Sequence, residues 1–201
     1  MVMLSAGNAS ALNHWSQNEF MTAESLDPGL TQTGIIFSLG DHFRSYYPQV
    51  RYGLGGLFEL GARFGVTAAK LEPSDSGDTL GALIGVDLKY QLIKETEGIP
   101  VDLSVDLGFD NTFMESNNAS ELTFAAVVSK GIPLTDRGYK LTPYGGLAMS
   151  ALYGSLPDKR GNTYVNVFAG LEWKISQKFG FLAEIKAGDS TVGGAGIRFE
   201  Y

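Results

Sequence analysis

The amino-acid sequence predicts an all-β fold: a closed, up-and-down antiparallel transmembrane β-barrel of about ten strands over residues 31–201, preceded by a non-barrel segment of residues 1–30. Three observations lead to this prediction. Apolar and polar residues alternate with period two through most of the chain after residue 30. Charged residues within one predicted strand lie an even number of positions apart, on one face of the strand. Short connections alternate with longer polar ones, as in transmembrane β-barrels.

Composition narrows the choice further. The chain has 201 residues, which suits a single domain, and 18% of them are charged, against about 25% in an average soluble domain. The net charge of −7 argues against nucleic acid as a partner. The absence of cysteine excludes disulfides and thiolate metal sites. No stretch reaches the roughly 18 uninterrupted apolar residues of a transmembrane helix.

Residues 1–30 show no strand alternation. Ala9-Ser10-Ala11 matches the small-residue pattern of a signal-peptidase site, but a complete basic region and a complete apolar region are both missing before it. It is either the end of a secretory signal that starts upstream or a chance run. Residues 11–26 are expected to form one short amphipathic helix, which Asp27-Pro28-Gly29 ends. The role of this segment stays open, since it could plug the lumen, pack below it or dock a partner.

The period-two pattern predicts ten strands, an even number, as bacterial barrels require. Most are close to the 9–11 residues or so that a tilted strand needs to cross a bilayer. The alternation is clearest in residues 163–175, where Val165, Val167 and Leu171 share one face with Trp173. The predicted strands are residues 31–40, 48–54, 57–68, 80–92, 100–110, 120–129, 141–153, 163–175, 179–187 and 191–201.

The placement of charges decides which face points inward. An Arg or Lys that faces lipid at mid-bilayer costs about 2–4 kcal/mol, so the lipid face must be almost free of charge. The other face should therefore line the lumen. The predicted lumen ionic network comprises Arg51, Glu59, Arg63, Asp87, Lys89, Asp102, Asp106, Glu172, Lys174, Glu184, Lys186, Arg198 and Glu200, with Asp110 and Glu121 on the same parity.

Two interpretations of this inward set remain. The favoured one is a salt-bridge network that fills a narrow lumen, because small barrels are packed with side chains and mixed signs can satisfy one another. The other is the selectivity lining of a small pore, in which the surplus of carboxylates would favour cations. Inward glycines are expected where neighbours crowd in a narrow barrel: Gly61, Gly65, Gly81, Gly85, Gly146, Gly170, Gly194 and Gly196.

Connection lengths predict an orientation. Leu54–Gly56, Glu95–Ile99, Ile132–Gly138 and Ser176–Lys178 are mostly short, whereas Asp41–Pro48, Lys70–Asp78, Thr112–Ala119 and Gly154–Asn162 are longer and polar. If the N-terminus is periplasmic, the short connections fall on the periplasmic side and the long ones outside.

The last strand carries a family resemblance. Gly194-Ala-Gly-Ile-Arg-Phe-Glu-Tyr201 looks like the signal read by the barrel-assembly machinery, with Ile197, Phe199 and Tyr201 as its alternating apolar and terminal aromatic residues. With the strand–turn–strand element of residues 51–63, residues 31–201 resemble bacterial outer-membrane porin-like barrels. Most members end in Phe, so Tyr201 is a departure.

The resemblance implies a place in the outer membrane, with contacts to its lipid and to the assembly machinery. It also implies a role as a narrow channel, or as a structural barrel that can be a subunit of a membrane complex. A soluble ligand-binding barrel is disfavoured, because many large apolar side chains would then have to fit inside it.

An enzyme is the alternative function. Asp41-His42 is the one pair with catalytic character, and it would make a barrel hydrolase that acts on lipid or peptide at the extracellular rim. Such a site needs a further group within hydrogen-bond reach, such as Asp110 or Ser190. The simpler interpretation is a solvated loop histidine. No metal or cofactor is expected, because the acidic stretch Glu72–Asp78 lacks the calcium-loop pattern.

Overall fold

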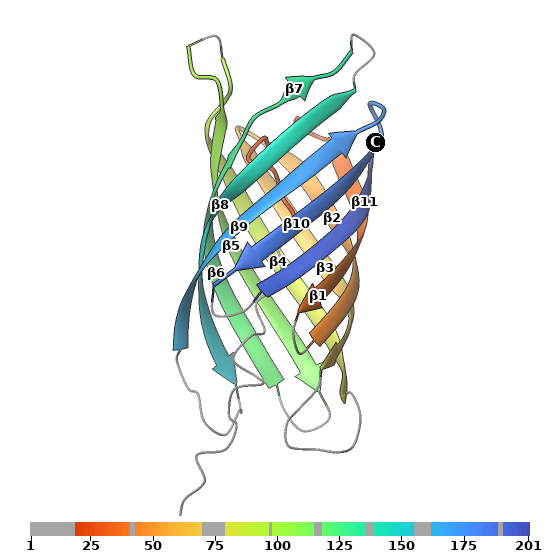
Figure 1. The fold of residues 1–201 in the computed structure, drawn as a ribbon, viewed down its shortest axis with the longest axis vertical. Coiled ribbons are helices and arrows are strands. Elements are labelled where there is room, and N and C mark those ends of the chain that lie inside the picture. Colours follow the sequence, from red (N-terminus) through yellow and green to blue (C-terminus); the bar gives the residue numbers. More distant parts are fainter. Residues whose placement is uncertain are drawn as a thin grey trace, which may run out of the picture.

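The computed structural model describes residues 19–40, 43–69, 79–96, 98–114, 118–135, 139–154, 162–188 and 191–201. Ten long strands and one strand of two residues lie in these ranges (Figure 1). They are β1 (Thr31–Gly40), β2 (Phe43–Gly55), β3 (Phe58–Ala69), β4 (Thr79–Ile93), β5 (Asp102–Met114), β6 (Asn118–Ser129), β7 (Ile132–Pro133), β8 (Lys140–Gly154), β9 (Asn162–Lys174), β10 (Phe179–Ala187) and β11 (Thr191–Glu200).

The ten long strands close into a barrel. Each pairs antiparallel with its neighbour in sequence, β1 pairs with β11, and β6 pairs with β8 past the short β7. Closure leaves none of these ten strands as a free edge, which removes the exposed backbone groups that an open sheet would present. The predicted fold class, a closed antiparallel barrel of about ten strands, is confirmed.

The barrel has two distinct ends. At one end Thr31 and Tyr201 exchange two main-chain hydrogen bonds of 2.9 Å, and we call this the Tyr201 end; it is uppermost in Figure 1. The opposite end, where β1 finishes, is the Gly40 end. Its connections are residues 41–42, 70–78, 115–117, 155–161 and 188–190. The predicted long connections therefore hold only at 70–78 and 155–161.

The predicted loop Asp41–Pro48 is wrong, because β2 already begins at Phe43. Pro48 looked like a loop residue because it has no N–H to give to a sheet. The sheet tolerates it because the pairing of β2 with β3 passes from Tyr46 directly to Gln49.

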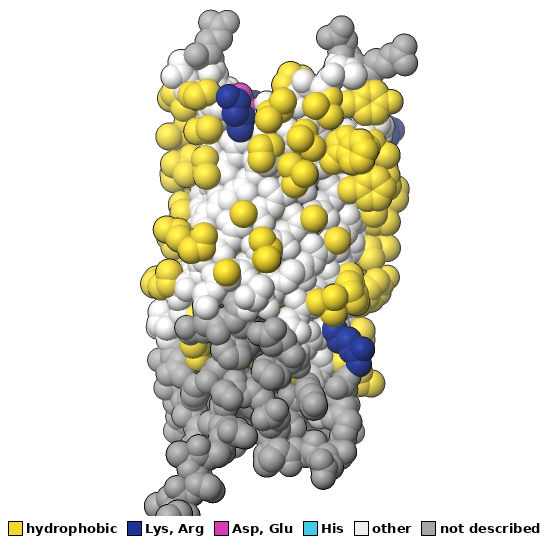
Figure 2. Space-filling model, in the orientation of Figure 1, with side chains coloured by type: hydrophobic (Ala, Val, Ile, Leu, Met, Phe, Trp, Pro, Cys, Tyr) yellow, Lys and Arg dark blue, Asp and Glu magenta, His cyan; other side chains and the backbone are white. Residues whose placement is uncertain are grey.

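The predicted faces are observed. Large apolar side chains point outward, and Leu80 is 71% exposed. The charged side chains on the opposite face of the strands are buried inside the barrel. In Figure 2 the hydrophobic side chains spread over the visible wall, and the Lys and Arg side chains lie towards its ends. Among the described residues no helix is long and apolar enough to cross a membrane.

The N-terminal segment differs from its prediction. Residues 19–26 form no helix, and Glu19–Ala23 are buried inside the barrel. A helix would have satisfied its own backbone, whereas this segment gives its N–H and carbonyl groups to the wall. The preceding part of the predicted helix lies outside the described residues. After this segment the chain leaves the lumen at the Tyr201 end, where Gly29 and Leu30 hydrogen-bond to Gly53 across the rim.

Candidate functional site: the lumen and its occupant

One wall of the lumen, made of β2 to β5, carries a continuous ionic network. Arg51 pairs with Glu59 and with Asp87, the latter at 2.6 Å between Nη2 and Oδ2. Arg63 pairs with Asp87 at 3.7 Å, and its Nε donates to Asp110 Oδ1 at 2.6 Å. These charges are buried, so their tolerance depends on this mutual pairing.

Strand register explains how the network forms. Arg51 on β2, Gly61 on β3 and Asp87 on β4 stand side by side, and the glycine lets the arginine lie over β3 to reach the aspartate. Arg63, Gly85 and Asp110 repeat this arrangement one strand further along. A methyl group at either glycine would overlap the aspartate carboxylate beside it. These inward glycines thus make room for ion pairs.

Three further acids on β5 and β6 are less completely satisfied. Asp102 Oδ1 accepts hydrogen bonds from Gln91 Nε2 at 2.7 Å and from the Glu95 N–H at 2.8 Å. Asp106 Oδ1 and Glu121 Oε2 are buried and have no hydrogen-bond partner within the described residues. The described residues therefore do not fill the hydrogen-bonding capacity of the carboxyl groups on this side of the lumen.

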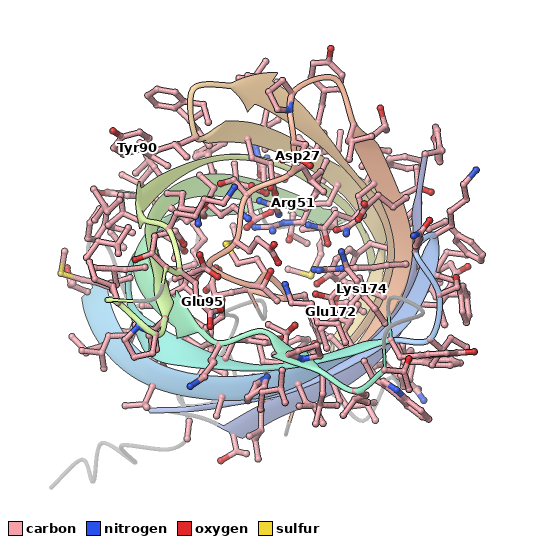
Figure 3. The ribbon with its side chains drawn as sticks, turned by 90° about the horizontal axis from the view of Figure 1, so that it is seen from above. Asp27, Arg51, Tyr90, Glu95, Glu172 and Lys174 are labelled. Carbon is pink, nitrogen blue, oxygen red and sulfur yellow. The ribbon has the colours of Figure 1, made fainter. Side chains whose placement is uncertain are left out.

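The opposite wall, from β9 to β11, pairs its charges near the Tyr201 end. Lys174 pairs with Glu200 at 3.1 Å and Arg198 with Glu172 at 3.5 Å. Figure 3, seen from the Tyr201 end, shows Glu172 and Lys174 within the ring of strands together with Arg51, and Tyr90 on its outside. Deeper in this wall, Glu184 and Lys186 face the N-terminal segment.

The N-terminal segment is held mainly through its main chain. Glu184 accepts the successive N–H groups of Glu19 and Phe20, each at 2.8 Å. Phe20 has φ = +44°, in the left-handed region, and successive N–H groups that converge in this way form an anion-binding concavity. Arg198 donates to the carbonyl oxygen of Phe20.

Contacts of the same kind continue towards the Tyr201 end. Lys89 donates to the carbonyl oxygens of Thr22 and Glu24, at 3.1 and 2.8 Å. The N–H groups of Ala23, Ser25 and Leu26 go to Ser129, Gln91 and Glu59 respectively. Gly53, at the Tyr201 end, leaves room for the segment beside β2. A methyl group there would overlap the carbonyl oxygens of Leu26 and Asp27.

Two apolar pockets receive side chains of the segment. Phe20 packs in one pocket, and Met21 packs in the other beside Ala23. The Phe20 pocket is formed by Ile36, Tyr47, Leu83 and Leu182. The Met21 pocket is formed by Ala125, Val127, Tyr144, Ala148 and Phe168. Phe20 and Met21 are 0% and 1% exposed, so burial favours this position by a few kcal/mol for each side chain.

Residues 19–26 occupy the lumen between its walls, beside the salt bridges. The ion pairs of β2 to β5 connect strands of one wall, whereas residues 19–26 contact β3, β4, β6, β10 and β11. At the Tyr201 end a cavity of about 80 Å³ remains beside Thr22 and Arg51, which is room for a few waters. The favoured interpretation, a salt-bridge network that fills the lumen, gave its ion pairs but did not include this peptide.

Other predicted site residues have these positions. Asp41, His42 and Ser190, and with them the predicted catalytic pair, lie outside the described residues, as does the acidic stretch Glu72–Asp78. Ile197 and Phe199 lie on the outer parity of β11 and Tyr201 follows at its end, alternating with inward Arg198 and Glu200. Within the described ranges, no group of three or more His, Asp or Glu residues could hold a metal ion.

Comparisons with known proteins agree with the fold. The sequence matches no model of a known protein family and no characterised protein sequence. The structure resembles the β-domain of the Bordetella autotransporter BrkA, with a TM-score of 0.54 and 14% identity over 86% of this chain and 98% of that one.

It also resembles the N-terminal barrel domain of Pseudomonas aeruginosa OprF, with a TM-score of 0.41 and 14% identity over 88% of this chain and 100% of that one. The KdgM porin aligns with a TM-score of 0.43 and 12% identity over 84% of this chain and 98% of that one. The chain thus shares its barrel fold with the β-domain of a bacterial autotransporter.

Proposed function

We propose that this protein is an outer-membrane β-barrel that its own N-terminal segment keeps closed at rest. It would then serve as a structural or complex-forming barrel, and as a channel only when the segment is displaced. The observation that carries the proposal is the occupied lumen, in which Glu19–Ala23 are buried between opposite walls.

The outer surface supports a place in a membrane. Large apolar side chains cover the outside of the strands, and Lys94 and Lys130 lie just beyond strand ends. Such a surface would be unfavourable in water and is favourable in lipid. The alternating Ile197, Phe199 and Tyr201 fit the predicted contact with the barrel-assembly machinery, which remains part of the proposal.

Conductance of the intact chain in planar bilayers tests closure. Protein taken from the outer-membrane fraction of the host, and shown to be folded by its heat-dependent gel mobility, should stay silent at both polarities. Silence is expected because residues 19–23 are buried between opposite walls of the lumen and hydrogen-bond to both. Steady single-channel currents from the folded, intact chain would contradict the closed barrel, and recovery in the soluble fraction would contradict its location.

A further inference from the structure

The lumen holds residues 19–26 in the way a binding protein holds a peptide ligand. We propose that it is a peptide-binding tunnel that also accepts a separate peptide with an acidic, an aromatic and an aliphatic residue in succession, the pattern of Glu19-Phe20-Met21. This inference rests on the proposed closure by the segment, and goes beyond it in assigning the lumen a class of ligand.

Most of the recognition is independent of the side chains of the segment. The wall satisfies five N–H groups, those of Glu19, Phe20, Ala23, Ser25 and Leu26. It also satisfies the carbonyl groups of Phe20, Thr22 and Glu24. Every peptide presents such groups, so a separate chain can make the same hydrogen bonds in the same position.

Three contacts select the side chains at Glu19, Phe20 and Met21. Lys186 binds the Glu19 carboxylate at 2.8 Å, with both groups buried. Phe20 and Met21 occupy the two apolar pockets, one beyond the other along the segment. An aromatic ring, a flexible apolar chain and a carboxylate in this order therefore fit the tunnel best, because a polar residue in either pocket would lose its water without a partner.

The wall needs an occupant of this chemistry. Without the segment, Glu184 would lose the N–H donors of Glu19 and Phe20, and Lys89 would lose two carbonyl acceptors. Water can replace these hydrogen bonds but cannot fill the apolar pockets at the same gain. The connection to the barrel is exposed at Asp27–Gly29, so the segment is in effect a tethered peptide.

The test converts the tether into a separable peptide after folding. A protease site is inserted after Pro28 in the full chain, with Phe20→Ala and Met21→Ala in the same chain to weaken the resident segment. The barrel is folded in detergent, cleaved and passed through gel filtration. A fluorescent synthetic peptide with the sequence of residues 19–26 is then titrated, beside the same peptide carrying Phe20→Ala and one of scrambled sequence.

We expect the cleaved segment to leave and the labelled peptide to bind, with an affinity roughly tenfold or more above that of the Phe20→Ala peptide. The uncleaved wild-type chain should not bind it, since the tethered segment holds the site. Retention of the weakened segment after cleavage would show that the main-chain contacts hold it without the two apolar side chains, and would overturn the proposed selection for an aromatic and an aliphatic residue.

Two other results would also overturn it: no binding to an emptied barrel whose gel mobility shows that it is still folded, or equal binding of the scrambled peptide. Neither result affects the closed resting state, which the conductance of the uncleaved chain measures separately. Currents through the uncleaved chain would instead remove the proposed closure. The two failures are therefore distinguishable.

Discussion

The two walls of the lumen satisfy their charges in different ways. On β2 to β5, Arg51 and Arg63 reach over glycines to acids two strands away, and the network forms within one wall. On β10, Glu184 and Lys186 contact Glu19 of the N-terminal segment. The ion pairs of Arg51 and Arg63 therefore contribute to the stability of the barrel itself, whereas Glu184 and Lys186 contribute to the hold on its occupant. Substitutions at these two sets of residues should have separate effects.

The largest effect is expected in the first wall, from Arg63→Ala. Asp110 would lose its ion pair with Arg63, and Asp87 would lose one of its two arginine partners, which leaves buried carboxylates without full compensation. Breaking a buried pair in this way costs about 3–5 kcal/mol. Urea unfolding followed by heat-dependent gel mobility should show this loss in the free energy of unfolding of the barrel.

Two glycine variants sharpen the test. Gly85→Ala should disturb the same Arg63–Asp110 pair, because its methyl group would overlap the Asp110 carboxylate. Gly193→Ala, on the outer face of β11 with no atom within 4 Å of the added methyl group, is the matched control. An unfolding free energy that is unchanged in Arg63→Ala would show that the network does not stabilise the first wall.

A smaller effect, confined to the segment, is expected from Glu184→Gln. The amide keeps the shape but loses the charge that receives the N–H groups of Glu19 and Phe20. Hydrogen bonds to a charged group contribute about 1.5–3 kcal/mol, so the docked state of the segment should weaken by roughly that amount. Limited proteolysis with mass spectrometry should show faster cleavage within residues 19–26, while unfolding of the barrel changes little.

Glu200→Gln, at the rim beside Lys174, serves as the control and should leave this cleavage rate unchanged. If Glu184→Gln destabilises the whole barrel as much as Arg63→Ala does, then the two walls do not differ in the way that their contacts indicate.

The sequence could predict which charged residues face the lumen, but it could not predict the partner of each one. Shared parity within a strand was enough to place Arg63 and Glu184 on the inner face, because a lipid face excludes charge. Parity says nothing about partners, which depend on register between strands, as in the alignment of Arg63, Gly85 and Asp110.

A place in the lumen was one of three roles left open for the N-terminal segment, but its conformation and contacts could not be predicted, for a related reason. Residues 19–26 are too short and too irregular for a periodic signal, and their partners are spread from Glu59 to Arg198. Apolar Phe20 and Leu26 suggested a helix by their spacing, but the wall pockets and wall hydrogen bonds determine the conformation instead. The inward position of Tyr47 was not predicted either. Residues 43–47 looked like a loop, so β2 was predicted to begin too late.

The smallest effect is expected at the mouth, where Lys140 on β8 pairs with Glu24 at 2.6 Å. Both side chains are partly exposed, so Lys140→Ala should loosen the segment by no more than about 1 kcal/mol, and less at high salt. Burial alone would raise the pKa of Glu24, but the hydrogen bond and charge of Lys140, with Lys174 and Lys89, lower it below its ordinary 4.5.

A lowered pKa fixes the sign of the pH dependence. The contribution of Glu24 is fully present above the ordinary pKa of 4.5 and is lost as the pH falls through the lowered value. Proteolysis within residues 19–26 of the wild-type chain should therefore quicken on strong acidification, and Lys140→Ala should flatten that dependence. A cleavage rate that does not change on strong acidification, or that falls, would contradict this contribution of Glu24.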